Sequence, residues 1–276
     1  MQRREFSKQL LRGAAWASAA LSGCATNAGT THAALAPPAV ASTGRGPHAK
    51  IRAICFDLFT LFDPRSVQAV AETLVPGRAA ALCESWRTRQ FQYAFLRAAA
   101  GQYADFRVVT REALDFAARS CALTLSEAKA EALVEAYSKL EPWPDSRERL
   151  LGWKHAGLRL APLANYSPRM LSGLLAHAGL EDLFDAQIST DAARTFKPDP
   201  RAYALGASAL GLPREQIAFA AFGGWDAAGA RWFGYPTFWV NRLAVPAEQL
   251  GPGPDASGPT LAELDRFVSS WSDGPL

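Results

Sequence analysis

Apolar and polar positions follow two different rhythms along this chain, and the change falls near residue 140. From residue 66 to about 140 the spacing is helical throughout. The stretch 126–140 opens with Ser126, a residue type that commonly caps a helix N-terminus. One apolar helix face is predicted from positions at helical spacing, namely Leu82, Trp86, Tyr93 and Leu96. The run Glu141-Pro142-Trp143-Pro144-Asp145 ends this helical region.

Beyond residue 145, short apolar runs alternate with helical patterns. Strands are expected at 51–56, 158–163, within 180–189, at 217–222 and at 237–241, and helices at 146–155, 170–177, 202–210 and 226–233. Such βαβ alternation predicts a parallel sheet with helices on both faces. The simplest architecture is an α/β fold with a Rossmann-like core, formed by residues 51–65 and 145–276. A helical cap, residues 66–144, is inserted after the first strand.

The first 24 residues have the features of a bacterial export signal. Arg3-Arg4-Glu5-Phe6-Ser7-Lys8 resembles a twin-arginine motif, and the apolar stretch 10–21 is too short for a stable membrane-spanning helix. Leu21-Ser22-Gly23-Cys24 resembles a lipobox, which implies lipid attachment at Cys24. Chance produces either half readily, but not both in this order. We expect an exported, periplasmic protein. By analogy with other bacterial lipoproteins, Ala25 rather than an acid after the cysteine favours the outer membrane over the inner one.

Composition limits the classes of partner. Residues 25–50 are rich in small residues and lack periodicity, so a flexible tether is expected there. The chain is 49% hydrophobic and 20% charged, as is usual for a globular protein. Its formal net charge is only +3, which argues against nucleic acid as a partner. Membrane contact is expected only through the signal and its lipid. The other cysteines, Cys55, Cys83 and Cys121, lack the spacing of a metal motif or disulfide framework.

An acid stands at the end of the first predicted strand. Asp57 follows the apolar run 51–56, at the edge where open α/β sheets place their ligands. A carboxylate beside a core needs a partner or a function, because an unpaired charge there is costly. Two interpretations are open: Asp57 caps the next turn, or it acts as a nucleophile.

Five stretches occur in an order that points to one family. They are Phe-Asp-Leu-Phe-Thr-Leu-Phe-Asp (56–63), Trp-Arg-Thr-Arg-Gln-Phe-Gln-Tyr-Ala-Phe-Leu-Arg (86–97), Leu-Ala-Asn-Tyr-Ser-Pro (163–168), Phe-Lys-Pro-Asp-Pro-Arg-Ala-Tyr (196–203) and Trp-Asp-Ala-Ala-Gly-Ala-Arg-Trp-Phe-Gly-Tyr-Pro-Thr (225–237). Over about residues 51–243 the chain resembles the haloacid dehalogenase superfamily, and within it the type II (L-2-haloacid) dehalogenases. The resemblance implies hydrolytic dehalogenation of short (S)-2-haloalkanoic acids. A carboxylate displaces the halide from C2, and water hydrolyses the resulting ester; no cofactor is implied.

The resemblance also assigns roles residue by residue. Asp57 matches the nucleophile, Lys197 the lysine beside it, and Arg87 the arginine that receives the halide. A surface lysine and a solvated helix arginine are the plainer interpretations, and they fit the flanking residues less well. Asp226 either orients Lys197 or caps the helix that it begins. The matches to substrate-pocket residues are Asn165, Phe59, Thr60, Phe106, Tyr203 (near the lysine) and Trp225, of which the Phe and Trp residues are also consistent with core packing.

The Mg²⁺-dependent phosphoryl transfer of the superfamily is not expected, and no metal site is predicted. Phe59 and Phe222 stand where that chemistry requires acids, whereas Mg²⁺ needs several oxygen ligands. The chain also departs from the type II pattern: a glycine before Thr60 is absent, Ala164 replaces a serine, Tyr166 a glycine, and Ala221-Phe222-Gly223 a Ser-Ser-Asn. These changes remove polar groups that support hydrolysis. The alternative is therefore an impaired or inactive periplasmic lipoprotein with a binding or scaffold role. A homodimer is compatible with the resemblance.

Overall fold

The computed structural model describes residues 49–271. The twin-arginine motif, Cys24 and the expected tether up to residue 48 lie outside the described residues. Within 49–271, no helix combines the length and apolar character that crossing a membrane requires.

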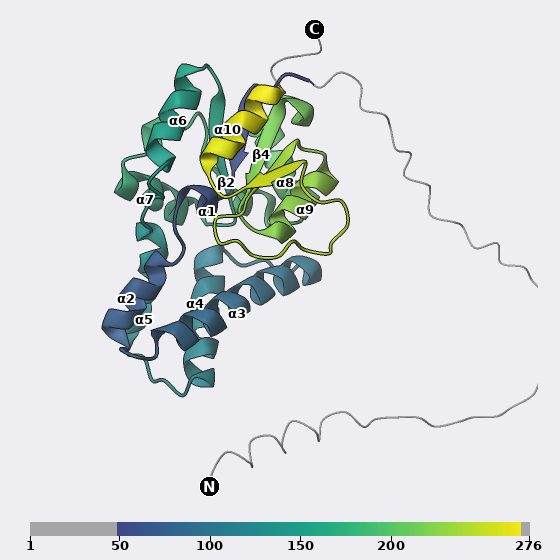
Figure 1. The fold of residues 1–276 in the computed structure, drawn as a ribbon. Coiled ribbons are helices and arrows are strands. Elements are labelled where there is room, and N and C mark those ends of the chain that lie inside the picture. The colour runs from purple at the N-terminus through teal and green to yellow at the C-terminus, as the bar shows by residue number, and fades with distance from the viewer. Residues whose placement is uncertain (1–48, 272–276) are drawn as a thin grey trace, which may run out of the picture. The chain divides into compact units, whose positions relative to one another are not determined.

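A parallel sheet of six strands forms the centre of the fold, in the order β3-β2-β1-β4-β5-β6 (Figure 1). The strands are β1 (Ala53–Phe56), β2 (Arg159–Ala164), β3 (Ile188–Ser189), β4 (Ile217–Ala221), β5 (Thr237–Val240) and β6 (Ala256–Gly258). Every neighbouring pair runs parallel. The expected α/β fold with a parallel sheet is confirmed.

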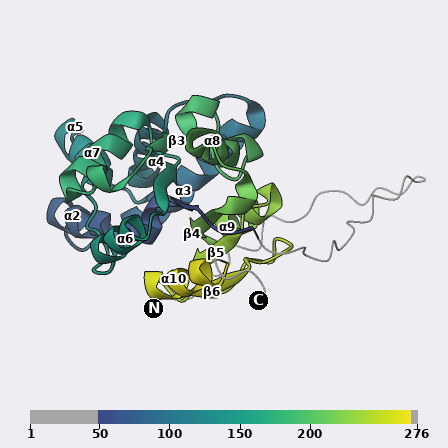
Figure 2. The same cartoon turned by 90° about the horizontal axis from the view of Figure 1, so that it is seen from above.

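Helices cover both faces of the sheet, because successive residues of each strand point to opposite sides. Ile54 and Phe56 belong to the larger apolar cluster, whereas Ala53 and Cys55 belong to a second cluster on the other side. The helices are α6 (Ser146–His155) and α10 (Leu261–Ser270) on the first side, and α8 (Pro200–Leu210) and α9 (Gly224–Phe233) on the second (Figure 2). Helix α7 (Pro168–Ala178) connects β2 toward β3.

Between β1 and β2 the chain leaves the sheet. After the short α1 (Leu58–Leu61) it forms α2 (Ser66–Leu74), α3 (Ala79–Ala100), α4 (Phe106–Ser120) and α5 (Glu127–Glu135), which we call the helical layer. Helices α3 and α4 are joined by hydrogen bonds, since Trp86 Nε1 donates to the Thr110 carbonyl at 2.8 Å. Ser126 is the N-cap of α5, and its hydroxyl accepts from the Lys129 N–H at 3.3 Å, which confirms that prediction.

The buried face of α3 differs from the expected one. Leu96 is 64% exposed, so it does not belong to the apolar face that the spacing predicts. The buried positions are Ala79, Leu82, Trp86, Gln90 and Ala94. Gln90 is 2% exposed and donates to Thr110 Oγ1 at 2.7 Å. Gln90 can be buried because Thr110 on α4 accepts its hydrogen bond, so the buried face of α3 includes a polar position. Apolar spacing alone does not reveal such a position.

Two elements near the C-terminus were not expected from the sequence, β6 and α10. Helix α10 begins with a capping box, in which Thr260 Oγ1 accepts from the Ala262 N–H and Glu263 Oε2 accepts from the Thr260 N–H. The Thr-x-x-Glu spacing is readable from sequence and was the available signal.

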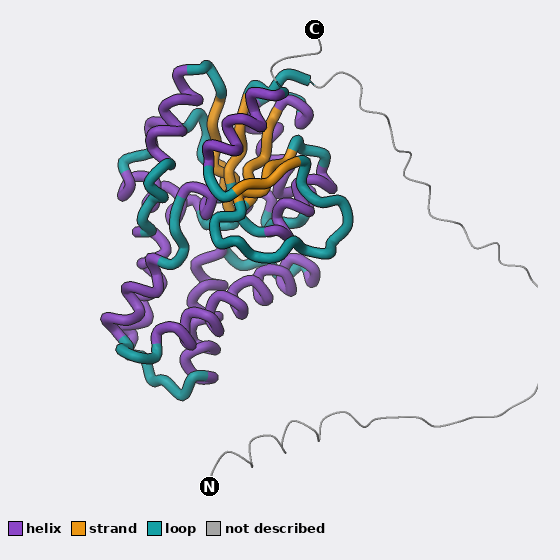
Figure 3. The backbone as a smooth tube through the Cα atoms, viewed as in Figure 1, coloured by secondary structure: helices purple, strands orange, loops and turns teal. Residues whose placement is uncertain are grey.

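The strand order places β1 and β4 side by side at the middle of the sheet. The connections that follow these two strands lead in opposite directions, and such a point leaves a crevice beyond the carboxyl ends of the strands. Asp57 directly follows β1, and Phe222 directly follows β4. The tube view shows that the long loop after β5 lies at the same end of the sheet (Figure 3).

Candidate active site

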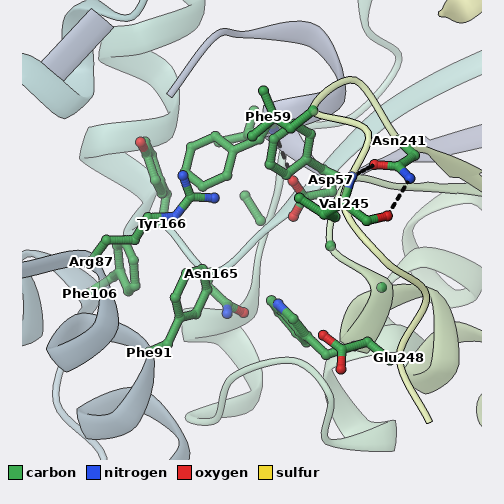
Figure 4. Close-up of a pocket in the computed structure, with 17 residues that line it drawn as sticks. Asp57, Phe59, Arg87, Phe91, Phe106, Asn165, Tyr166, Asn241, Val245 and Glu248 are labelled. Carbon is green, nitrogen blue, oxygen red and sulfur yellow. Dashed lines mark hydrogen bonds between the residues drawn. The ribbon is translucent and has the colours of Figure 1, made fainter. Parts of the chain in front are cut away.

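A cavity of about 200 Å³ lies at this crevice (Figure 4). Asp57 reaches it from the end of β1, and Asn165 from the end of β2. Arg87 and Phe91 reach it from α3, and loop residues between 241 and 248 complete its wall. The sheet, the helical layer and the loop therefore enclose one apolar pocket with a few polar groups, the usual form of a small-molecule site.

Asp57 uses its two carboxylate oxygens differently. Oδ1 accepts from the Phe59 N–H at 2.9 Å, which makes Asp57 the N-cap of α1. Oδ2 accepts from Lys197 Nζ at 2.7 Å. The side chain is 15% exposed and lines the cavity. The capping interpretation is therefore correct for one oxygen, and it leaves a paired carboxylate aimed at the pocket.

Lys197 is buried between two carboxylates. Its Nζ donates to Asp57 Oδ2 and, at 2.8 Å, to Asp226 Oδ2, and the side chain is only 1% exposed. Burial by itself lowers the pKa of Lys197, but the carboxylates of Asp226 and Asp57 outweigh it and raise the pKa above its ordinary value. The ammonium group therefore stays charged and holds Asp57 in place.

Asp226 orients Lys197 and does not cap its helix. Its Oδ2 accepts from Lys197, and its Oδ1 accepts from the Tyr203 hydroxyl at 2.7 Å. The N-cap of α9 is Gly223, without a side-chain capping bond. Burial raises the pKa of Asp226 to about 6, against the opposing attraction of the Lys197 ammonium. Of the two interpretations, positioning of the lysine is the one that the geometry supports.

Asn165 is fixed by its carbonyl oxygen, which accepts from the Lys197 backbone N–H at 2.8 Å. Within residues 49–271 its Nδ2 has no hydrogen bond, although the side chain lines the cavity. The amide donor is therefore the group of Asn165 that is available to a bound molecule.

Arg87 approaches the cavity from the helical layer, and Figure 4 shows it and Asp57 entering from different sides. Its guanidinium carbon lies 6.0 Å from the ring centroids of Phe59, Phe91 and Phe222. In the described part of the chain, Arg87 forms no ion pair, whereas Arg97, Arg107 and Arg111 of the same helical layer do. A planar cation that is surrounded by aromatic rings and lacks a carboxylate is suited to receive an anion.

Aromatic side chains form most of the remaining wall. Phe106 stacks on Tyr166 with ring centroids 5.5 Å apart. Trp225 packs edge-on against Phe91, at 5.5 Å, and against Phe95, at 5.3 Å. Phe59, Phe106 and Trp225 all line the cavity.

Neither Thr60 nor Tyr203 lines the cavity, which corrects their place among the substrate-pocket residues, but Tyr203 does lie near Lys197 as the resemblance implies. Both side chains are fully buried. The Thr60 hydroxyl donates to the Asp57 carbonyl at 2.7 Å, since it follows Asp57 by only three residues and turns back on the first turn of α1. Tyr203 lies behind Asp226, where its hydroxyl supports the carboxylate that orients Lys197.

Gly223 takes part in shaping the wall. A Cβ atom at this position would lie 2.7 Å from Trp225 Nε1 and 3.1 Å from Trp225 Cδ1. The Trp225 ring therefore occupies the space that any side chain at residue 223 needs. The loss of a polar side chain here is coupled to the position of Trp225, which fills the gap with apolar surface.

Phe91 and the loop residues were missed as cavity residues. Phe91 lies four positions after Arg87, so helical spacing alone places it on the same face. The loop after β5 contributes Asn241, Leu243, Val245 and Glu248. Its sequence has no periodic pattern, and the signal that it offered was its position directly after a strand.

The donor set does not suit a divalent cation. The Lys197 ammonium already lies between Asp57 and Asp226, where it would repel a metal ion. Among residues 49–271, no group of three or more His, Cys, Asp or Glu side chains is arranged to hold a metal.

Several known proteins are similar in sequence to this chain. A family model of haloacid dehalogenase-like hydrolases matches residues 51–234. The (S)-2-haloacid dehalogenase of Pseudomonas sp. (strain YL) is 40% identical over 206 residues, covering 74% of this chain and 89% of that protein. Haloacetate dehalogenase H-2 of Moraxella sp. (strain B) is 38% identical over 221 residues, covering 80% of this chain and 99% of that protein.

Solved structures agree with the sequences. The L-2-haloacid dehalogenase from Xanthobacter autotrophicus has a TM-score of 0.75 and 37% identity, and the match covers 79% of this chain and 98% of that one. The same enzyme with chloropropionic acid covalently bound has a TM-score of 0.73. The shared sheet, the family match over residues 51–234 and these identities show that the chain belongs to the haloacid dehalogenase-like hydrolases.

Proposed function

We propose that this protein hydrolyses the carbon–halogen bond of short (S)-2-haloalkanoic acids through an ester on Asp57. The observation that carries the proposal is the pairing of a lysine-held carboxylate with an arginine that lacks an ionic partner in the described chain, on different sides of one small cavity. The relatives named (S)-2-haloacid and haloacetate dehalogenases support the same chemistry.

In the first half-reaction an Asp57 carboxylate oxygen attacks C2 of the substrate. A C–O bond forms while the carbon–halogen bond breaks, and the halide departs with its electron pair toward Arg87. The aromatic wall excludes water, so the guanidinium is the principal stabilisation for the new anion. The Asn165 amide is the second donor on that wall.

In the second half-reaction water adds to the carboxyl carbon of the ester. The bond between that carbon and the Asp57 oxygen that attacked C2 breaks, so this oxygen leaves in the 2-hydroxy acid, and the oxygen of water restores the Asp57 carboxylate. Asp226 is fully buried and does not line the cavity, so the proton of the water reaches it through Lys197, whose Nζ bridges Asp57 and Asp226; burial raises the pKa of Asp226 to about 6. Displacement inverts C2 and hydrolysis does not, so the (S)-acid gives the (R)-alcohol.

Halide release from L-2-chloropropionate tests the proposal, with residues 25–276 and the Asp57→Asn variant side by side. We expect halide release by the unchanged protein and none by Asp57→Asn. Intact mass spectra of the unchanged protein should also show a transient increase in mass from the ester. If a folded protein releases no halide and gains no mass, the dehalogenase proposal is wrong.

We also propose that turnover needs no metal ion. The support is that Lys197 occupies the space between the two carboxylates. Turnover that persists in excess EDTA is expected, and loss of turnover that added Mg²⁺ restores would contradict this part.

The location of the protein is a separate proposal. We propose export through the twin-arginine signal, lipid attachment at Cys24 and anchoring to the outer membrane, on the motifs of residues 1–24 alone. Loss of lipid labelling and of membrane fractionation in Cys24→Ala is expected. A homodimer is proposed from the resemblance only, and light scattering of residues 25–276 tests it.

A further inference from the structure

A second cavity lies on the far side of Arg87. Its volume is about 340 Å³, and it shares Arg87 and Phe59 with the first cavity as lining residues. These two side chains therefore form a partition between the reaction cavity and a second space, which we call the outer cavity. Nothing in the proposed reaction so far uses it.

The outer cavity leads from the interior to the surface. Its inner end is lined by Gln90 and Tyr137, which are 2% and 5% exposed. Its outer end is lined by Gln68, Ala80 and Glu84, all exposed. Helices α2 and α3 form its two sides.

The inner end of the outer cavity is suited to an anion. Arg87 brings a positive charge, and the carboxylate among the lining residues is Glu84, three residues before Arg87 on α3 and exposed. Burial raises the pKa of the Tyr137 hydroxyl and raises the pKa of the Cys83 thiol to about 11, so both remain neutral. The charged groups at the outer end are Glu84 and Arg65, of opposite sign, and Arg65 is paired with Asp63.

The geometry of displacement creates a need for such a space. The halide leaves C2 on the side opposite to the attacking oxygen, which is the side of Arg87. At that moment the ester still occupies the first cavity of about 200 Å³, which leaves the halide little room to move within it. This step rests on the proposed function.

We propose that the halide leaves through the outer cavity, passing from one face of the Arg87 guanidinium to the other. The hydroxy acid leaves later by the first cavity, because it is released only after hydrolysis. Arg87 thus contacts the halide in both cavities in turn, and the Phe59 side chain moves to let it pass. The two products leave by different routes and at different times.

Two neighbouring alanines on α3 give a matched test. Ala80 lines the outer cavity, whereas Ala81 is equally an exposed alanine of the same helix and does not line it. Ala80→Trp narrows the route, and Ala81→Trp adds the same bulk elsewhere. Gln68→Trp, from α2, is a second plug in case the first variant is unstable.

Ester formation and free halide are measured separately with L-2-bromopropionate, by quenched-flow intact mass and by a bromide sensor. We expect ester formation at the unchanged rate in both plugged variants, with free bromide delayed at least about five-fold relative to Ala81→Trp. Bromide that appears as fast as in Ala81→Trp, in a plugged variant that is folded, overturns the exit route. Absence of the ester in the unchanged protein overturns the proposed function instead.

A binding measurement judges the site without turnover. Crystals of Asp57→Asn, which cannot form the ester, are soaked in bromide. We expect anomalous density in contact with Arg87 inside the outer cavity. Density confined to the first cavity, or no density at Arg87, rejects the proposal even if dehalogenation is established.

Discussion

Two cations serve this site, Lys197 from the turn before α8 and Arg87 from the helical layer, and they are held in opposite ways. Lys197 is 1% exposed and neutralised by two carboxylates. Arg87 is half-buried, and the described chain offers it aromatic rings rather than acids. A cation that is already paired serves to position another group. A cation without an ionic partner is available to bind a ligand. Ionic pairing therefore distinguishes Lys197, which positions the nucleophile, from Arg87, which binds the leaving anion.

The largest effect is expected on removing the paired cation. Lys197→Ala leaves Asp226 buried opposite Asp57 with no compensating charge, which costs about 3–5 kcal/mol of unfolding free energy at pH 7. Chemical denaturation measures it, with the exposed Lys154→Ala as control, for which a change within about 0.5 kcal/mol is expected. An equal, small effect of both substitutions would show that Lys197 is not the partner that the two acids depend on.

The unpaired cation should behave differently. Arg87→Lys keeps the charge but loses the planar guanidinium, so kcat/KM for L-2-chloropropionate should fall about 10- to 100-fold, the equivalent of one charge-assisted hydrogen bond. Stability should change by less than about 0.5 kcal/mol, because no ion pair in the described chain is broken. Arg89→Lys, two residues further on α3, is the control and should retain activity. If Arg87→Lys loses stability but keeps its activity, Arg87 is a structural residue and not the one that binds the anion.

The pH dependence distinguishes the two half-reactions. The pKa of Asp226 is raised to about 6, so the carboxylate is protonated below that pH and cannot accept a proton from water. Ester hydrolysis should therefore fall about tenfold per pH unit below pH 6. Ester formation should lack this limb, because the raised pKa of Lys197 keeps its ammonium charged across the range. Single-turnover rates between pH 4.5 and 8 measure both, and a shared acidic limb would argue against Asp226 as the base.

The sign of the stability change is also fixed by that pKa. A carboxyl group whose pKa in the folded state exceeds its unfolded value favours folding at low pH, and that contribution is lost as the pH rises through the folded value. Removing Lys197 also removes the attraction that holds the pKa of Asp226 down, so this pKa rises further in Lys197→Ala and the destabilisation should shrink as the pH falls toward 6 and below. Repeating the denaturation at pH 5 checks this.

The smallest effect on activity is expected from a substitution at Ala164, a residue that lines the first cavity. Ala164 is 2% exposed and lines the cavity, so Ala164→Ser places a hydroxyl beside the substrate. One neutral hydrogen bond should lower KM about two- to tenfold. Ala221→Ser is the control, since Ala221 is buried outside the cavity and should not lower KM.

The sequence predicted the elements that carry strong periodicity or capping signals, and it predicted Asp57, Lys197 and Arg87 through their motifs. It could not predict what depends on partners distant in the chain. The buried stripe of α3 is set by Gln90 meeting Thr110, and the loop from 241 to 248 reaches the cavity without any periodic signal. Thr60 and Tyr203 were placed in the right neighbourhood, but their hydroxyl groups point to Asp57 and Asp226 rather than to the cavity.

The two bonds that hold the Asp57 carboxylate have a further consequence once it has reacted. Esterification at either oxygen leaves the other as the ester carbonyl, with the Phe59 N–H on Oδ1 or the Lys197 ammonium on Oδ2. That carbonyl oxygen is therefore polarised already, and it faces a donor when water adds and negative charge develops on it. The cap of helix α1 and the buried lysine thus serve as an oxyanion hole for hydrolysis, built from the same contacts that position the nucleophile.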